Sequence, residues 1–184
     1  MRDLINIIEN AQQDLNEVSR VDPLEGGEEG HYSSRLWKAF SEFGATKAGN
    51  LVGDYEYWTA ETPSGNMLAF AVEVDDSDTV PVAYLDLDHK YDDIYQVQMI
   101  YTDNEARGQG LAYALYLAVL RQGAELISDA EQTPGGQSIW AKLMDDYRVR
   151  VTGVDENDEE HDIDDISDHY DHEETAYFKA VWVG

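Results

Sequence analysis

The sequence of 184 residues contains no cysteine. It can therefore form no disulfide bond, and it offers neither a thiolate nucleophile nor a cysteine-based zinc site. Basic residues are scarce as well: 12 Lys and Arg stand against 39 Asp and Glu, for a formal net charge of -27 at pH 7. Because phosphate recognition needs clustered cations, we expect no direct binding of nucleic acid or of an anionic membrane.

Long apolar runs are also absent. The longest, Leu111–Leu120, is much shorter than the roughly 20 apolar residues that span a bilayer. Acidic residues follow soon after Arg2 and no apolar run stands behind them, so the N-terminus lacks the pattern of a signal peptide. We therefore expect a cytoplasmic protein without a transmembrane segment.

The apolar content is nevertheless sufficient for a packed core. Hydrophobic residues make up 42% of the chain and aromatic residues 11%, which argues against disorder despite the charge. The length suits one domain. The acidity itself has three interpretations: a soluble or salt-adapted surface, attraction of a cationic ligand, or mimicry of a nucleic acid.

Two helices are predicted at the start of the chain. Apolar residues recur at helical spacing over residues 3–18, and Ser33 or Ser34 can cap a second helix further on. The pattern then changes to short β-rich runs. We therefore expect a helical N-terminal extension over residues 1–50 and one domain over residues 51–184.

The domain combines β-rich runs with two helices. Four strands come first, joined by short turns, which favours an antiparallel meander. A helix that is apolar around most of its circumference follows, and we expect it to be buried between layers. The fold class predicted is α/β, in α+β layers. The expected elements are strands 55–60, 67–74, 80–87 and 94–102, helix 111–123, strand 125–128, helix 133–146, and strands 148–154 and 175–183.

One segment, residues 155–174, is strongly acidic: 12 of its 20 residues are Asp or Glu. It also holds His161, His169 and His172, and the stretch from His169 to His172 could bind zinc or another divalent ion. The glycine that a calcium-binding loop requires is missing. We interpret the segment as a solvated acidic loop and predict no metal site.

A glycine-rich turn joins the strand 94–102 to the buried helix. It reads Arg107-Gly108-Gln109-Gly110-Leu111-Ala112. The free amides and the dipole at the start of the helix suit a pyrophosphate. A dinucleotide fingerprint would need a third glycine where Tyr113 stands, and the Gly-Lys-Ser/Thr of a P-loop is absent. An ordinary tight turn remains the structural alternative.

The turn resembles the coenzyme A-binding motif of the GNAT superfamily of N-acetyltransferases, Arg/Gln-x-x-Gly-x-Gly/Ala. Arg107 to Ala112 match this motif in full, and the preceding strand aligns without a gap, with Thr102 and Asn104 in place of the usual Val and Pro. The order of the expected elements also matches. The resemblance covers about residues 54–184.

The resemblance implies a mixed sheet, flanked by helices, that splays open after its fourth strand. It implies that acetyl-coenzyme A lies in the opening, with its pyrophosphate on the turn and its pantetheine paired with the strand. It also implies direct transfer of the acetyl group to an amine. The coenzyme-binding residues implied are Ile100, Tyr101, Thr102, Arg107, Gly108, Gln109, Gly110, Leu111 and Ala112.

The sequence departs from the family on the catalytic side. Trp140 stands where the family has a Tyr that acts as general acid, and an indole cannot supply that proton. Tyr147, further along the same helix, is our candidate for the acid, and Asp129 at the end of its strand is our candidate for the base. Asp86 and Asp88 share one face of a strand. We expect this face to be solvated, and either residue is only a minor candidate for the base.

The acceptor cannot be inferred by analogy, because both predicted N-terminal helices precede the strands instead of interrupting them. The first functional hypothesis is acetyl transfer from acetyl-coenzyme A to a cationic small-molecule or peptide amine. The alternative is a catalytically weak or inactive acidic binding protein on the same scaffold: a modulator of a host protein, a nucleic-acid mimic or a virion component. Residues 126–143 are similar to acetyltransferase-like proteins encoded by bacteriophages, which would place the protein in the host cytoplasm.

Overall fold

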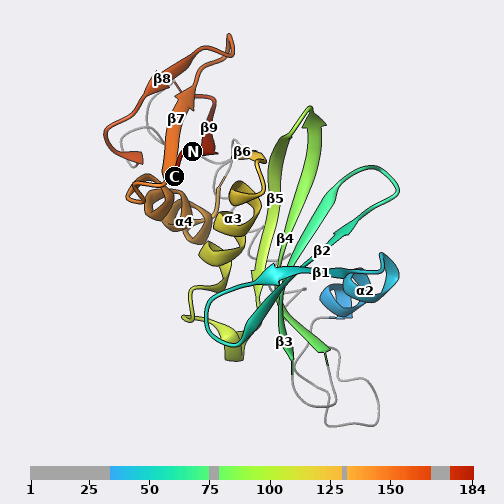
Figure 1. Ribbon diagram of the computed structural model, residues 1–184. Helices are drawn as coiled ribbons and strands as arrows, with labels where there is room; N and C mark the ends of the chain where they lie inside the picture. The colour runs from blue at the N-terminus through green and yellow to red at the C-terminus, as the bar shows by residue number, and fades with distance from the viewer. Residues whose placement is uncertain (1–33, 75–78, 130–131, 167–174) are drawn as a thin grey trace, which may run out of the picture.

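The computed structural model describes residues 34–74, 79–129, 132–166 and 175–184 (Figure 1). The helix predicted over residues 3–18 lies outside these ranges. The second predicted helix is confirmed as α2 (Ser34–Glu42). It stops just before Gly44, whose φ of 64° lies in the left-handed region that favours glycine after a helix.

The described strands form one nine-stranded sheet in the order β1-β2-β3-β4-β5-β6-β9-β7-β8. The first five strands form the predicted antiparallel meander, and β5 and β6 are parallel. Antiparallel pairs join the last four strands. The strands are β1 (Thr46–Asn50), β2 (Tyr55–Glu61), β3 (Met67–Val74), β4 (Thr79–Tyr91), β5 (Ile94–Thr102), β6 (Glu125–Ile127), β7 (Val149–Val154), β8 (Glu160–Asp162) and β9 (Tyr177–Trp182).

Both helices predicted within the domain are present. They are α3 (Leu111–Arg121) and α4 (Pro134–Met144), and a short 3-10 helix, η1 (Asn104–Ala106), precedes α3. Thr133 caps α4, since its side-chain oxygen accepts a hydrogen bond from the Gly136 amide at 3.2 Å. Within the described residues, no helix is long and apolar enough to cross a membrane.

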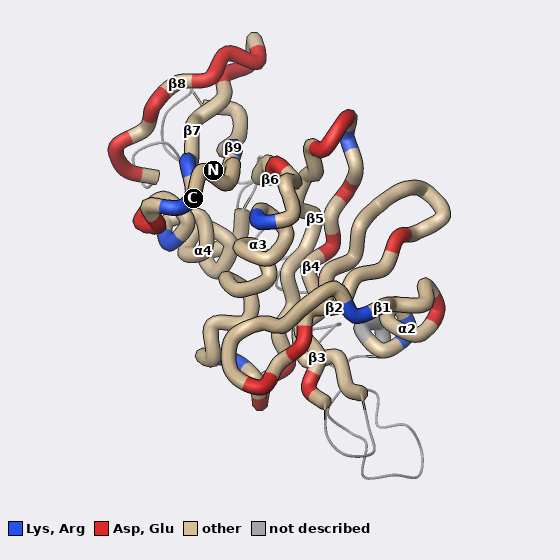
Figure 2. Tube along the Cα trace, viewed as in Figure 1, with Lys and Arg blue, Asp and Glu red and all other residues tan. Residues whose placement is uncertain are grey.

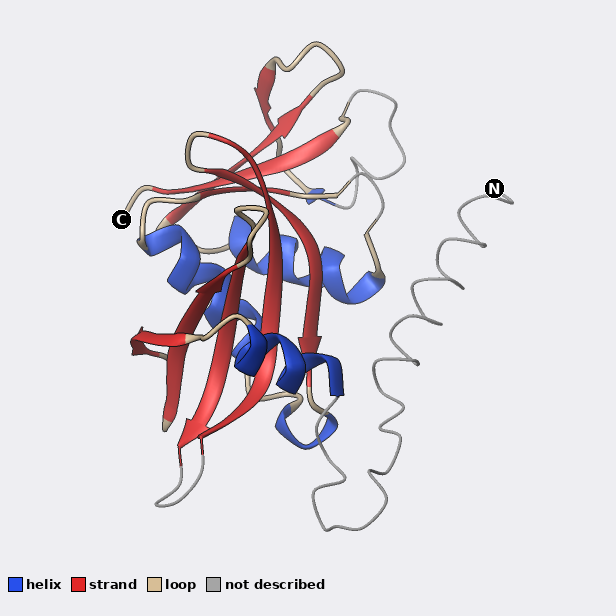
Figure 3. Ribbon diagram, turned by 90° about the vertical axis from the view of Figure 1, so that its right-hand side faces the viewer, coloured by secondary structure: helices blue, strands red, loops and turns tan. Residues whose placement is uncertain are grey.

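The sheet separates two hydrophobic clusters. Figures 1 and 3 show α2 on one face of the sheet and α3 and α4 on the other. On the α2 face, the Phe40 ring packs edge-on against Phe70, with ring centroids 5.3 Å apart. On the other face, Leu115 and Leu120 of α3 are fully buried in the larger cluster. This confirms the predicted burial of α3 and the mixed α/β architecture with a splayed sheet.

Two strands differ from the expectations. The strand β1 lies inside the N-terminal segment that was expected to be helical. Four of its five residues are exposed, and its backbone pairing with β2 makes it a strand. The strand β4 runs on to Tyr91, where the prediction ended at residue 87, because its hairpin with β5 closes at Tyr91 and Ile94. Neither pairing leaves a strong hydrophobic pattern in the sequence.

The interpretation of residues 155–174 as a solvated loop fits most of the described side chains, which are exposed, but not the short strand β8 or two buried residues. The strand β8 pairs with β7, and Ile163 and Ile166 are 8% and 4% exposed. The Lys179 ammonium forms an ion pair with Glu160 at 2.9 Å, which compensates charge at this strand. Two buried apolar residues and a neighbouring cation therefore hold part of the segment on the domain. His169 and His172 lie outside the described residues.

A polar cluster, called here the clamp, joins α3, α4 and β7. The Tyr113 hydroxyl donates a hydrogen bond to Asp146 at 2.6 Å, and the Arg148 guanidinium donates to both carboxylate oxygens at 2.8 and 2.6 Å. The Arg148 hydrogen bonds hold the pKa of Asp146 well below its usual range. Burial, reinforced by Asp146, raises the pKa of Tyr113 to about 12. At neutral pH, all three side chains are therefore paired.

Candidate active site

The sheet opens between β5 and β6. These strands pair only where Ile94–Gln96 face Glu125–Ile127. Beyond Gln96, β5 continues to Thr102 with β4 on one side and no described strand on the other. The backbone of residues 97–102 therefore presents an unpaired edge, called here the split, on which an extended chain could form hydrogen bonds.

A β-bulge lies where the two strands separate. Asp86 pairs with Met99 and Leu87 pairs with Val97, so Gln98 is an extra residue in β5. A bulge bends its strand and increases the local twist. The bend falls two residues after the last pair with β6 and so accompanies the divergence of the two strands.

The glycine-rich turn lies at the far end of the split. Gly108 and Gly110 have φ values of 80° and 78°, which side chains of other residues rarely adopt. A Cβ atom added to either residue would meet no atom within 4 Å. Glycine is therefore needed for the backbone conformation, and the space above the turn is open.

Helix α3 begins at this turn without a side-chain cap. Gly110 occupies the cap position and has no side chain that could accept a hydrogen bond, so the first amides of α3 donate to no capping side chain. The Arg107 side chain donates to the Thr102 carbonyl oxygen at 3.1 Å, and the Tyr55 hydroxyl donates to the Gln109 side chain at 3.0 Å. The turn is thus anchored, carries one guanidinium, and combines the features of an anion site.

The aromatic member of the predicted coenzyme strand, Tyr101, is buried at 3% exposure. Its side chain belongs to the cluster on the α2 face, whereas Ile100 packs towards α3. Burial, with a further contribution from Asp103, raises the pKa of Tyr101, so its phenol stays neutral at physiological pH. Any contact of a ligand with residues 100–102 along the strand edge would therefore involve mainly their backbone.

The predicted base lies at the split. Asp129 follows β6, and the Gln96 side chain donates a hydrogen bond to its carboxylate at 3.5 Å, across the point where the strands part. Its backbone carbonyl accepts a hydrogen bond from Gln132 at 3.4 Å. Asp129 is thus held beside the last paired residues of β5 and β6.

The predicted acid lies elsewhere. Tyr147 follows α4 and is 89% exposed, with the Arg148 guanidinium 5.8 Å from its ring centre. Trp140, which stands in the usual Tyr position, is 1% exposed and packs between Tyr116 and Phe178, each with a ring centroid 6.1 Å away. The indole is a core residue, so a Tyr placed there would have a buried hydroxyl.

Two site residues were missed at the sequence level, Gln96 and Gln98. Both lie in a strand whose sequence shows no feature beyond that of an ordinary β-strand. Gln96 is the last residue of β5 paired with β6, and Gln98 is the bulged residue, and both positions follow from the register of β5 with its neighbours. Asp86 and Asp88 point to the face of the sheet that carries α2, and Asp88 is paired with Lys90 at 2.7 Å. The pair with Lys90 supports the structural interpretation of Asp88. Among the described residues, no group of three or more potential metal ligands occurs.

A family model described as the Acetyltransferase (GNAT) family matches residues 32–133, more than half of the chain. The protein therefore belongs to the GNAT family of acetyltransferases. Members of this family generally transfer an acetyl group from acetyl-coenzyme A to an amine. No curated protein matches the sequence.

Solved structures with a similar fold share little sequence with the chain. A GNAT acetyltransferase from Staphylococcus aureus Mu50 is 11% identical, over 66% of this chain and 70% of its own, with a TM-score of 0.38. The ribosomal-protein-S18-alanine N-acetyltransferase of Escherichia coli is 14% identical, over 94% and 89%, with a TM-score of 0.35. Diaminobutyrate acetyltransferase EctA of Paenibacillus lautus, in complex with its substrate and coenzyme A, is 14% identical over 64% and 69%, with a TM-score of 0.34.

Proposed function

We propose that the protein transfers the acetyl group of acetyl-coenzyme A to the nitrogen of a cationic amine. The observation that carries this proposal is the position of the uncapped start of α3 at the end of the unpaired β5 edge. An anion site and an edge for extended pairing are thereby continuous. A ligand with a pyrophosphate and an amide-containing arm matches both features.

The residues of the turn fit the pyrophosphate chemically. We propose that the amides of residues 107–112 and the Arg107 guanidinium bind it, in the open space over Gly108 and Gly110. The backbone of residues 100–102 would pair with the pantetheine arm. In an acidic protein, the single guanidinium of the turn gives this location a local preference for an anion.

Asp129 is the proposed base. An amine attacks as the neutral species, so one proton must leave the ammonium before the nitrogen–carbon bond forms and the carbon–sulfur bond breaks. A carboxylate at the split, kept in position by Gln96, can accept that proton directly or through water. Tyr147 is the proposed donor of a proton to the departing thiolate, and its exposure means that solvent can serve as a competing donor.

The acceptor is proposed to be a cationic small molecule or peptide. Acidic residues are spread along the chain in Figure 2, and Asp86 and Asp88 lie on β4, the strand paired with β5. A net charge of -27 attracts cations and speeds their encounter with the protein. The same charge distribution offers no comparable attraction to an acidic acceptor.

Calorimetry with coenzyme A tests the proposed cofactor site. Gly110→Glu would place a carboxylate at the turn, so we expect binding to weaken by about 100-fold or more. Gly123→Glu is the matched control, since Gly123 also has a positive φ and open space but lies beyond the opposite end of α3. Equal affinities for wild type and Gly110→Glu would show that the cofactor site is misassigned.

A second candidate function is a binding protein on the acetyltransferase scaffold that docks a basic partner, such as a host protein bound by a phage-encoded modulator. The burial of Trp140 favours it, because the family's usual acid is replaced by a core residue. Release of free coenzyme A with a panel of amines separates the two functions. Tight coenzyme binding without release from any amine would favour the binding protein.

A further inference from the structure

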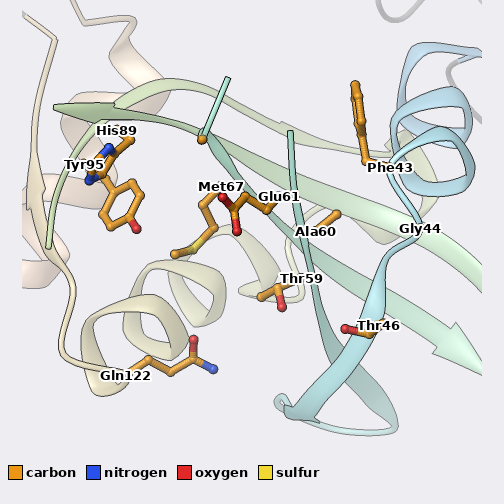
Figure 4. A pocket seen from close by; sticks show the side chains of 11 residues that line it. Phe43, Gly44, Thr46, Thr59, Ala60, Glu61, Met67, His89, Tyr95 and Gln122 are labelled. Carbon is orange, nitrogen blue, oxygen red and sulfur yellow. The ribbon is translucent and has the colours of Figure 1, made fainter. Parts of the chain in front are cut away.

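A pocket of about 450 Å³ lies on the sheet at the opposite end of α3 from the glycine-rich turn (Figure 4). It is lined by eleven residues, which come from the five strands β1 to β5, from the connections after α2 and between β2 and β3, and from the end of α3. The eleven residues of α3 rise about 16 Å at 1.5 Å per residue. The pocket is therefore separate from the proposed pyrophosphate site, and its volume is in the range of small-molecule sites.

The lining of the pocket combines polar groups with a smaller amount of apolar surface. Figure 4 shows the side chains of Glu61, Met67 and Tyr95 directed into the same space, with Gln122 of α3 facing them. Among the described residues, neither the Glu61 carboxylate nor the Tyr95 hydroxyl makes a hydrogen bond, and the Tyr95 ring lies against the His89 ring with centroids 5.2 Å apart. Both groups are thus available to a ligand, while Met67 and the Tyr95 ring supply apolar surface.

The electrostatics of the pocket favour a cation. None of its eleven lining residues, all of which are described, is Lys or Arg. The negative end of the α3 dipole faces it at Gln122. Burial raises the pKa of Tyr95, and the nearby carboxylates of Asp93 and Glu61 raise it further. Arg121, the nearest cation of α3, lies against the Trp182 ring at 5.8 Å and does not line the pocket.

We propose that this pocket is a second ligand site that binds a small organic amine in its ammonium form. The ammonium group pairs with the Glu61 carboxylate and the Tyr95 hydroxyl, and the apolar body of the amine lies on Met67 and the aromatic ring. A bare metal ion is a poor match, because the lining offers one carboxylate, Glu61, and one imidazole, His89, whose Nε2 lies 2.8 Å from the Asp92 carbonyl oxygen, and the volume far exceeds one ion. An anion is disfavoured because no lining cation would compensate its charge.

The site goes beyond acetyl transfer, and its test does not depend on the proposed function. Phenethylamine is a suitable probe, since it joins one ammonium group to an aromatic body, and phenethyl alcohol is its uncharged counterpart. Ligand-observed NMR titration should show saturable binding of the amine and no saturable binding of the alcohol. Glu61→Gln should weaken amine binding about tenfold or more, as the loss of a charge-assisted hydrogen bond predicts.

Two control variants distinguish binding in the pocket from a general attraction of cations to the acidic protein. Glu73→Gln removes the same charge from an exposed position outside the pocket, and Asp129→Asn removes one from the split. Glu73→Gln should bind phenethylamine as wild type does, and Asp129→Asn should keep the binding that Glu61→Gln loses. Absence of saturable binding to wild type, or equal weakening by Glu61→Gln and Glu73→Gln, would overturn the proposal. Weakening by Asp129→Asn alone would also overturn it, because the amine would then occupy the split. Calorimetry with coenzyme A on the same samples reports on the proposed function separately.

Discussion

The split and the clamp lie near each other on α3 but use polar groups in opposite ways. At the split, the β5 edge is unpaired and the first turn of α3 has no side-chain cap. In the clamp, Tyr113, Asp146 and Arg148 satisfy one another through four hydrogen bonds. A paired cluster stabilises the fold, whereas unpaired backbone groups on an exposed edge can be used by a ligand. Substitutions in the two regions should therefore affect different measurements.

The largest expected effect is on turnover, from Asp129→Asn. If Asp129 is the base, loss of its basicity should lower kcat by about 10² to 10⁴-fold, the usual value of general base catalysis. The melting temperature and the affinity for coenzyme A should stay close to those of wild type. Asp145→Asn, at the end of α4, is the charge-matched control. Unchanged turnover in Asp129→Asn, measured as release of free coenzyme A, would remove this residue from the mechanism.

Substitutions in the clamp should lower the stability of the folded protein. Asp146→Ala leaves the Tyr113 hydroxyl and the Arg148 guanidinium without their shared partner, and we expect a loss of about 2–3 kcal/mol in the free energy of unfolding. Denaturant unfolding measures it. Coenzyme binding at the split should change little, because the clamp does not contribute to the turn. A larger effect on binding than on stability would contradict the distinction between the two regions.

The pH dependence of the clamp sharpens this test. Because the pKa of Asp146 is depressed in the folded protein, its contribution is fully present above the unfolded-state pKa of about 4. The contribution is lost as the pH falls through the folded-state pKa. The stability difference between wild type and Asp146→Asn should therefore be constant from pH 7 to about pH 5 and shrink below about pH 4. A difference that persists undiminished at low pH would show that packing, and not the charge, is responsible.

Tyr147→Phe should have a smaller effect on turnover. The thiol of coenzyme A, by analogy with Cys, has a pKa of about 8–9, so solvent can protonate its thiolate at neutral pH. We expect a loss of no more than about tenfold in kcat, growing as the pH rises. The proposed role of Tyr147 as acid would be excluded if the pH–rate profiles of wild type and Tyr147→Phe coincide.

The smallest effect is expected from salt. If the acidity serves cationic ligands, association of a cationic acceptor should slow as ionic strength rises and the Debye length falls to about 8 Å. The melting temperature without ligand should change by only a few degrees up to molar salt. A continuous gain of stability over that range would instead indicate a salt-adapted surface.

Local signals in the sequence were enough for most of the fold. The predicted helix 133–146 begins within one residue of α4, and the apolar circumference of residues 111–123 predicted the buried helix α3. The glycines before α3 predicted a tight turn, and in the structure Gly108 and Gly110 have positive φ values that most other residues rarely adopt. Each of these signals depends on a residue and its immediate neighbours in the chain.

Tertiary structure decided the features that relate distant segments. The bulge at Gln98 exists only as a register between β4 and β5, and the split exists because β6 pairs with three residues of β5 and then diverges. The burial of Trp140 depends on Tyr116 and Phe178, which come from other elements. A local sequence pattern predicts which face of an element is apolar, but it does not predict where the pairing of that element with its neighbour ends.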